Sequence, residues 1–180
     1  MTNKEKYEAT LIGCAIGDVL GMPIEGWKRE QIKKYVGKVR EFIDPVLLYD
    51  EKGELLREDE FGRLKYYTKN LKKGEYTDDT ILTIAIAESI AEKKYLDLDD
   101  NAKKQLDAFL SDKSPDGKFK SGFGKTTKDG FYNLSKGISP LESGVIGGPG
   151  AAPSMKISPV GLYMNAVKDY ENGLLCQKCG

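Results

Sequence analysis

Histidine is absent from this sequence of 180 residues, which also contains only one tryptophan and three cysteines. Without histidine, the chain cannot form a Ser-His-Asp triad, a Cys-His pair or a histidine zinc site. Catalysis by its own residues must therefore use carboxylates, hydroxyls, lysines, backbone dipoles or a hard metal ion. An odd and sparse cysteine count is typical of a reducing compartment, and we expect a cytoplasmic protein.

Net charge and long hydrophobic runs are also missing. The 28 basic and 28 acidic residues cancel, which removes the main electrostatic argument for binding nucleic acid. No basic run is long enough to form a membrane-surface patch. The apolar stretch 9–24 carries Asp18 in its middle and is too short to span a bilayer. We therefore expect neither a nucleic-acid partner nor membrane association.

The length predicts a single domain over residues 1–180, large enough for a core of its own. Apolar residues recur mostly at helical spacing, which indicates a mostly α-helical fold. The exception is the stretch 46–66, where short apolar runs on both sides of Lys52-Gly53 suggest a small hairpin or an irregular loop.

Periodicity and capping residues predict where the helices lie. The helix from Thr77 to Lys93 is apolar on nearly all sides and should be central and buried. Gly13, Gly17 and Gly21 recur at every fourth position of the first helix, a stripe that would let another backbone or a ligand approach. A first helix is expected from Lys4 to about Leu20, and a later one is capped by Asp97 or Asp99. The buried face of that later helix is expected to comprise Leu98, Ala102, Leu106, Phe109 and Leu110. Further elements are expected as a helix capped by Thr126 or Thr127, a helix start at Ser139-Pro140, and a helix from Ser154 to Tyr170.

The first candidate site stands at the opening of the central helix. Thr77, Asp78 and Asp79 supply a hydroxyl and two adjacent carboxylates, which are hard oxygen ligands of the kind that Mg²⁺, Mn²⁺ and Ca²⁺ prefer. The same residues could instead act as an N-cap and as partners of the helix dipole, with no metal present. The sequence leaves both interpretations open.

The second candidate is a pair of carboxylates around the end of the first helix. Asp18 lies among apolar residues on that helix, and Glu25 follows in a turn after Pro23. One interpretation is a carboxylate pair at the rim of a pocket. The other is that Asp18 caps a neighbouring backbone and that Glu25 is simply solvated.

The third candidate is the glycine-rich stretch 147–150, which precedes the last predicted helix. Small residues ahead of a helix expose backbone N–H groups and can cradle a phosphate. A plain flexible loop is the alternative.

Taken together and in this order, these segments resemble the ADP-ribosylglycohydrolase family, which includes the dinitrogenase-reductase-activating glycohydrolases. The resemblance is carried by residues 13–25, 74–83, 122–137 and 150–162. It implies an all-α fold, an orthogonal bundle of helices, with a binuclear Mg²⁺ or Mn²⁺ centre. It also implies hydrolysis of the glycosidic bond to ADP-ribose in a modified protein or a small conjugate.

The resemblance also implies roles for individual residues. Thr77, Asp78 and Asp79 match the first metal-binding triplet of the family. Glu25 matches its gating acidic residue and Asp18 the acidic residue of its first helix, and we expect both to be catalytic. The expected substrate-binding residues are Gly122, Phe123, Gly124, Gly148, Gly150, Ala151 and Ala152.

One part of the family pattern is missing from this sequence. The second metal-binding motif, Asp-x-Asp-Thr, does not occur, and Asp169 is the only aspartate after Glu142. We therefore expect a truncated, partial domain with an incomplete second metal site. Such a domain would need a complementing C-terminal chain or would self-associate through an exposed apolar patch. The alternative is an inactive homologue that binds at most metal or ADP-ribose.

Overall fold

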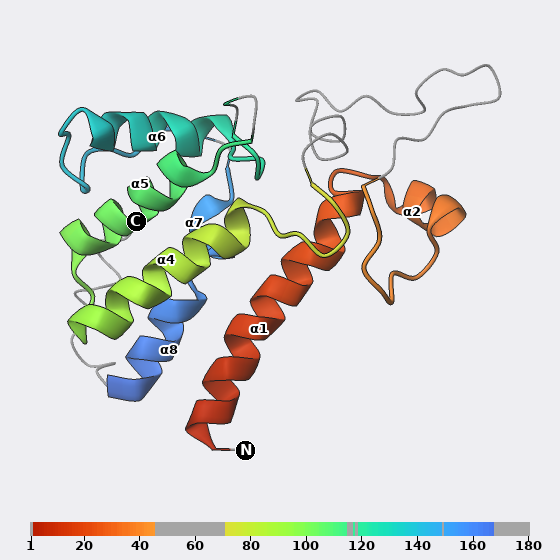
Figure 1. The fold of residues 1–180 in the computed structure, drawn as a ribbon, viewed down its shortest axis with the longest axis horizontal. Coiled ribbons are helices and arrows are strands. Elements are labelled where there is room, and N and C mark those ends of the chain that lie inside the picture. The colour runs from red at the N-terminus through yellow and green to blue at the C-terminus, as the bar shows by residue number, and fades with distance from the viewer. Residues whose placement is uncertain (1, 46–70, 115–116, 118, 149, 168–180) are drawn as a thin grey trace. The chain divides into compact units, whose positions relative to one another are not determined.

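The computed structural model describes residues 2–45, 71–114, 117, 119–148 and 150–167. Within these ranges it contains seven α-helices, one short 3-10 helix and no strand, so the predicted all-α fold is confirmed (Figure 1). The hairpin expected at 46–66 lies outside the described residues.

The chain divides into two compact units, which are described separately below. Unit 1 comprises Met1–Leu11, Ile81–Ser111 and Phe123–Gly180, and unit 2 comprises Ile12–Thr80 and Asp112–Gly122. A single domain over the whole chain stays a prediction.

The first helix, α1 (Asn3–Gly21), begins with two reciprocal hydrogen bonds. The Thr2 N–H donates to Glu5 Oε2 at 2.7 Å, and the Glu5 N–H donates to Thr2 Oγ1 at 3.2 Å. This capping box satisfies two of the N–H groups that a helix start leaves open. The helix then continues into the 3-10 turn η1 (Met22–Ile24), because Pro23 cannot extend a regular α-helix.

The glycine stripe of α1 faces open space. A Cβ atom placed on Gly13, Gly17 or Gly21 would meet no described atom within 4 Å. The side chains of Ile12 and Ile16 are 58% and 43% exposed. The close approach of another backbone, which the stripe led us to expect, is therefore not seen among the described residues.

In unit 2, α2 (Arg29–Tyr35) follows η1 after a short turn. The Lys28 N–H donates to Gln31 Oε1 at 2.9 Å and so caps the helix start. Gly37 adopts a φ of 75° and donates its N–H to the Ile32 carbonyl at 2.7 Å. Glycine suits this left-handed position because it carries no Cβ.

The central helix α4 (Asp78–Lys93) is largely but not wholly covered. Leu82 is fully buried, and Ala85 and Ile86 are 3% and 5% exposed. Ile84 lies on another side of the helix and is 43% exposed. The expectation of a helix buried on nearly all sides is thus wrong for the face that carries Ile84.

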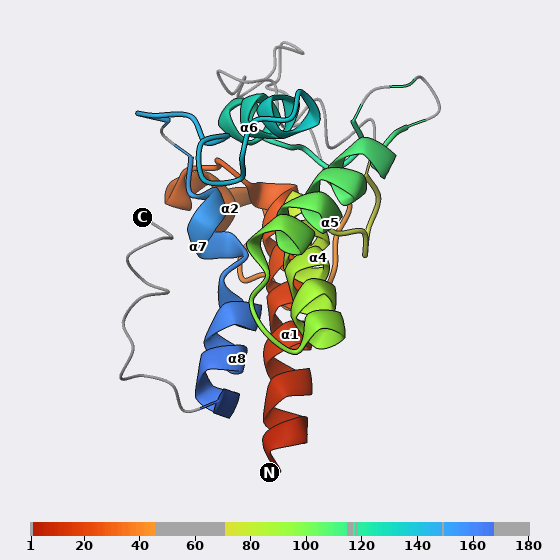
Figure 2. The same ribbon diagram turned by 90° about the vertical axis from the view of Figure 1, so that its left-hand side faces the viewer.

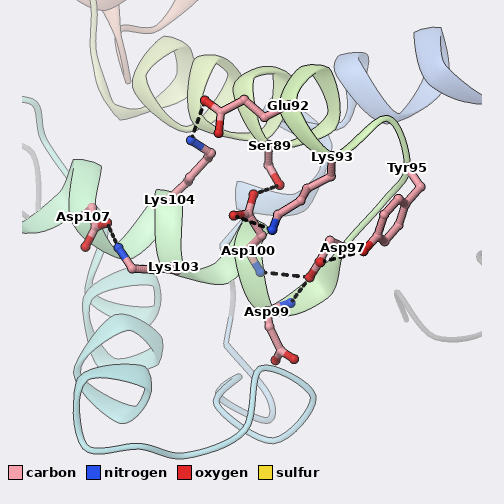
Figure 3. Close-up of polar contacts among 10 residues, drawn as sticks. All are labelled: Ser89, Glu92, Lys93, Tyr95, Asp97, Asp99, Asp100, Lys103, Lys104 and Asp107. Atoms are coloured by element: carbon pink, nitrogen blue, oxygen red, sulfur yellow. Dashed lines mark hydrogen bonds and ion pairs between the residues drawn. The ribbon is translucent and has the colours of Figure 1, made fainter.

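A polar junction joins α4 to α5 (Leu98–Ser111) within unit 1 (Figure 3). Asp97 caps α5 as expected, since its Oδ1 accepts the N–H groups of Asp99 at 3.1 Å and Asp100 at 3.0 Å. The fully buried Ser89 of α4 donates its hydroxyl to Asp100 Oδ2 at 2.7 Å. A buried hydroxyl with a charged partner holds the two helices in register.

Aromatic rings hold α5 against α6 (Lys125–Ser135), which lies beside it in Figure 1. The ring of Phe109 is fully buried and stacks on Phe131, with centroids 5.0 Å apart. Phe123 meets the same ring edge-on at 5.1 Å. Three phenylalanines in these geometries contribute about 0.5–1.5 kcal/mol per pair beyond the area they bury.

Two expectations for this helix pair were wrong. Phe109 is buried as expected, but Leu110 is 46% exposed, and the other buried residues of α5 are Asn101 and Gln105. The N-cap of α6 is Gly124, so neither Thr126 nor Thr127 caps it. The cap lies earlier because the extended backbone at Gly124 already precedes helical residues, and its carbonyl accepts the N–H of Lys128 at 3.0 Å.

The last predicted helix is two helices, α7 (Ala152–Met155) and α8 (Ser158–Val167), separated by a short break (Figure 2). Pro159 lies in the first turn of α8, where its missing N–H removes no helical hydrogen bond. Ser139-Pro140 forms a turn and not the expected helix start, because the Ser139 carbonyl accepts the N–H groups of Glu142 and Ser143, both at 2.9 Å.

Across the described ranges, no single helix is long and apolar enough to cross a membrane. The pair Asn3–Ile24 and Arg29–Tyr35, bent by 87°, meets the length and composition requirement only when its two parts are taken together.

Candidate functional site

Asp18 of α1 caps the start of α4 from a position 59 residues earlier in the chain. Its Oδ2 accepts the N–H of Thr77 at 2.9 Å, the N–H of Thr80 at 3.2 Å and the hydroxyl of Thr80 at 2.6 Å. Its Oδ1 accepts the hydroxyl of Thr77 at 2.8 Å. A carboxylate at a helix N-terminus is favoured by these bonds and by the helix dipole. Asp18 therefore has the contacts of a residue that positions others.

The hydrogen bond to Asp18 sets the orientation of the Thr77 hydroxyl. Thr77 is buried, with 4% of its surface exposed. Its only hydroxyl proton is directed to Asp18, so the oxygen can act toward any other group solely as an acceptor. The Asp79 N–H approaches that oxygen at 3.4 Å, which is a long bond. A hydroxyl oxygen whose proton is already donated elsewhere is oriented to act as a ligand of a hard cation.

Asp78 is the most strongly perturbed acid among the described residues. Burial, the largest cause, and the negative charge of Asp79 together raise its pKa from 3.8 to about 7. The charges of Glu25 and Asp18 act in the same direction. The negative charges of the other three carboxylates thus disfavour ionisation of Asp78. A nearby cation would offset this repulsion.

The oxygen donors fit a divalent metal in kind, but they do not complete a site. Thr77, Asp78 and Asp79 offer a hydroxyl and two carboxylates, the ligand types of Mg²⁺ and Mn²⁺. In the part of the chain that the structure describes, no group of three or more acidic or cysteine side chains is arranged to hold a metal ion. The described residues therefore supply oxygen donors of a suitable kind but no complete metal site.

Unit 1 contains a cavity of about 520 Å³ between α5, α6 and the segment 140–153. Three of the seven residues expected to bind substrate line it: Gly148, Gly150 and Ala152. The other four do not. Ala151 is the N-cap of α7, Gly124 is the N-cap of α6, Phe123 is buried in the aromatic cluster, and Gly122 belongs to unit 2.

The polar wall of this cavity was missed by the sequence analysis. Asn101 and Gln105 line it from α5, each only 8% exposed, and the Gln105 amide donates to Asn101 Oδ1. Lys156 Nζ donates to Gln105 Oε1 at 2.6 Å. The sequence did contain a signal for this wall, because Asn101, Gln105 and Phe109 are spaced four residues apart and therefore lie on one helix face. Buried Asn and Gln facing a cavity are available to orient a polar ligand.

Gly148 is the one glycine of the cavity loop at which a side chain would collide. A Cβ there would overlap Thr126 Cγ2 and lie 2.9 Å from Thr126 Oγ1, whereas a Cβ on Gly150 would meet nothing within 4 Å. Gly148→Ala should therefore lower the free energy of unfolding by about 1–3 kcal/mol, because the loop must shift away from α6. Urea denaturation measures the effect. Gly150→Ala is the matched control, and equal losses in the two variants would contradict this account.

The described residues form an all-α protein. At the N-terminus of its central helix, buried hydroxyl groups donate hydrogen bonds to a carboxylate from a distant position in the chain. The chain belongs to the ADP-ribosylglycohydrolase family, because the model of that family matches residues 1–175. The family-level resemblance found in the sequence is thereby confirmed.

Two curated relatives are similar to the chain over most of its length. An uncharacterized protein of Archaeoglobus fulgidus is 30% identical over 171 residues, which are 93% of this chain and 47% of the relative. The uncharacterized protein YegU of Escherichia coli K12 is 27% identical over 166 residues, which are 90% of this chain and 43% of the relative. The chain thus spans less than half the length of these relatives. No solved structure matches it.

Proposed function

We propose that this chain acts in the metal-dependent hydrolysis of a glycosidic bond to ADP-ribose, in a modified protein or a small conjugate. The observation that carries the proposal is the opening of α4. There, Asp18 orients the Thr77 hydroxyl, and buried Asp78 is held among other carboxylates with a pKa of about 7. Such an arrangement is costly for a folded protein without a cation, which supports a role for one.

In this proposal Thr77, Asp78 and Asp79 hold Mg²⁺ or Mn²⁺. When bound, the ion supplies Lewis-acid polarisation and a water of lowered pKa. Asp18 keeps the Thr77 oxygen pointed as an acceptor, and its four hydrogen bonds favour this positioning role over proton transfer. The Glu25 carboxylate stabilises positive charge at the anomeric carbon as the bond to the leaving group breaks. It takes a proton from the water that attacks this carbon and passes a proton to the leaving group.

The cavity of unit 1 is the proposed binding place for part of the ADP-ribose conjugate. Gly148 and Gly150 line it, and backbone N–H groups of such small residues can bind a diphosphate. Lys156, which also lines the cavity, adds a positive charge. The buried amides of Asn101 and Gln105 provide further donors and acceptors for a polar ligand.

Two further parts of the proposal concern partners and location. Because the described residues supply no complete metal site, we propose that the other ligands come from a complementing polypeptide or from a second copy of the chain. We also propose a cytoplasmic location, since an odd and sparse cysteine content suits a reducing compartment.

A second candidate function is binding of metal or ADP-ribose without catalysis. The observation in its favour is again the lack, among the described residues, of three or more acidic side chains arranged around one ion. A centre with two carboxylates and a hydroxyl can bind a divalent ion weakly while lacking the ligands that a binuclear centre needs.

Calorimetric titration with Mg²⁺, with and without ADP-ribose, tests the proposal, followed by an assay for release of ADP-ribose from ADP-ribosylated arginine. We expect Mg²⁺ to bind, ADP-ribose to strengthen that binding, and Thr77→Ala/Asp78→Ala to abolish both. Asp99→Ala is the matched control, because it removes an exposed carboxylate from the first turn of another helix. Binding without turnover would favour the second candidate, and the absence of any Mg²⁺ binding would refute both metal-based functions.

A further inference from the structure

The loop that follows α5 turns back on itself and is closed by one carboxylate. Asp112 Oδ2 accepts the N–H of Lys120 at 3.0 Å and the N–H of Ser121 at 2.8 Å. Asp112 Oδ1 accepts the hydroxyl of Ser121 at 2.8 Å. Three hydrogen bonds to a single charged group, across a separation of nine residues, fix the position of Ser121.

Ser121 in turn contacts the first residue of α4. Its carbonyl accepts the N–H of Asp78 at 3.0 Å, and Ser121 is only 3% exposed. The first N–H groups of a helix have no partner within the helix, so an external acceptor decides how that turn is held. Here the acceptor is a carbonyl that Asp112 keeps in place, and all three residues belong to unit 2.

A second contact ties the same loop to the segment just before α4. Lys120 Nζ lies 2.6 Å from Glu75 Oε1, and Glu75 Oε2 accepts the N–H of Lys72 at 2.8 Å. Neighbouring residues of the loop, Lys120 and Ser121, therefore hold the chain on the two sides of Thr77. The Asp18 carboxylate holds Thr77 itself from α1.

We infer that Asp112 is a positioning residue for the proposed metal site, acting through the Ser121 carbonyl on the backbone of Asp78. This inference rests on the proposed function, since it assigns Asp112 to the same oxygen cluster. Groups that orient metal ligands without touching the metal typically change affinity by about 10-fold to 100-fold when they are removed. Asp112 is placed to have such an effect, because its loss frees Ser121 and with it the partner of the Asp78 N–H.

The test compares Asp112→Ala and Asp112→Asn with Asp107→Ala. Asp107 is the matched control, because it is an exposed aspartate of α5 that pairs with Lys103, one turn away. Mg²⁺ affinity is measured by calorimetry at a temperature where every variant is folded, and amide hydrogen exchange is followed at Asp78 in the metal-free protein. We expect Asp112→Ala to weaken Mg²⁺ binding by about tenfold or more and to speed exchange at Asp78.

Asp112→Asn should lie between the alanine variant and the wild type, because its carbonyl oxygen still accepts from Ser121. Unchanged Mg²⁺ affinity in Asp112→Ala, with a wild type that binds Mg²⁺, would overturn the inference and leave the proposed function intact. Faster exchange spread evenly over all helices with unchanged affinity would also overturn it, since that pattern means a general structural role. If the wild type binds no Mg²⁺, the proposed function fails first and this role fails with it.

Discussion

Replacing Asp78 by asparagine is expected to stabilise the metal-free protein at pH 8. The pKa of Asp78 is raised from 3.8 to about 7, first by burial and then by the charge of Asp79. At a pH between these two values, the Asp78 carboxyl is ionised in the unfolded chain but protonated in the folded chain. The stability that this proton contributes is present below pH 4 and is lost as the pH rises to about 7.

The size of the effect follows from the same pKa. At about 1.4 kcal/mol per pH unit, the interval from 3.8 to about 7 corresponds to roughly 4 kcal/mol. The neutral amide of the variant would resemble the protonated acid at every pH, so the advantage of Asp78→Asn should be small at pH 4 and largest at pH 8. Urea denaturation across this range measures it. Asp99→Asn, at an exposed position, should show no such trend.

Adding Mg²⁺ should remove more than half of the stability advantage of Asp78→Asn over the wild type. A ligand that binds only the folded state at 100 times its Kd stabilises it by about 2.7 kcal/mol. Wild-type protein should gain this stability at pH 8, and Asp78→Asn should not, because it lacks the carboxylate. A metal-free Asp78→Asn variant that is less stable than the wild type at pH 8 would show that Asp78 is held by contacts stronger than its burial penalty.

Replacing Asp18 by alanine is expected to cost the folded protein about 3 kcal/mol or more, because the buried donors of Thr77 and Thr80 lose a charged acceptor. The change removes the acceptor for four donors at the start of α4, two N–H groups and two hydroxyls from Thr77 and Thr80. Thr77 and Thr80 are 4% and 3% exposed, so water cannot readily replace the lost carboxylate. Each bond to a charged group contributes about 1.5–3 kcal/mol, and the four are not additive because they share one side chain.

Thermal and urea unfolding measure the loss, and Mg²⁺ titration provides a second readout, since Thr77 would no longer be oriented. Glu8→Ala is the matched control on the same helix. Glu8 forms an exposed ion pair with Lys4, and its removal should change stability by about 0.5 kcal/mol or less. A loss of similar size in the two variants would mean that the cap on α4 contributes little. Asp18→Asn should lie between wild type and alanine, because one oxygen remains.

Local signals predicted most of the helices well. Asp97 or Asp99 was expected to cap α5, and Asp97 does so by accepting the N–H groups of Asp99 and Asp100. The end of α1 near Pro23 followed from the geometry of proline alone. These features depend on residues within about one helical turn of one another, and such contacts form in the same way whatever surrounds them.

Predictions failed where a distant element decided the outcome. Leu110 looked like a core residue by type, yet the aromatic contacts of Phe109 rotate α5 so that Asn101 and Gln105 are buried instead. Among the substrate residues, Phe123 proved to be part of that core. Helix rotation is set by the packing of neighbouring side chains, which periodicity in one segment does not contain.

At the candidate site, the sequence by itself determined that Thr77, Asp78 and Asp79 stand at the opening of a helix, because hydroxyl and acidic residues favour that position. It also determined the family, since the ordered motifs are specific even though each is modest. Only the tertiary structure decided that Asp18, from another helix, supplies the cap and that Asp112 reaches Asp78 through Ser121. Both links join residues far apart in the chain, and such pairs meet only once the helices have packed.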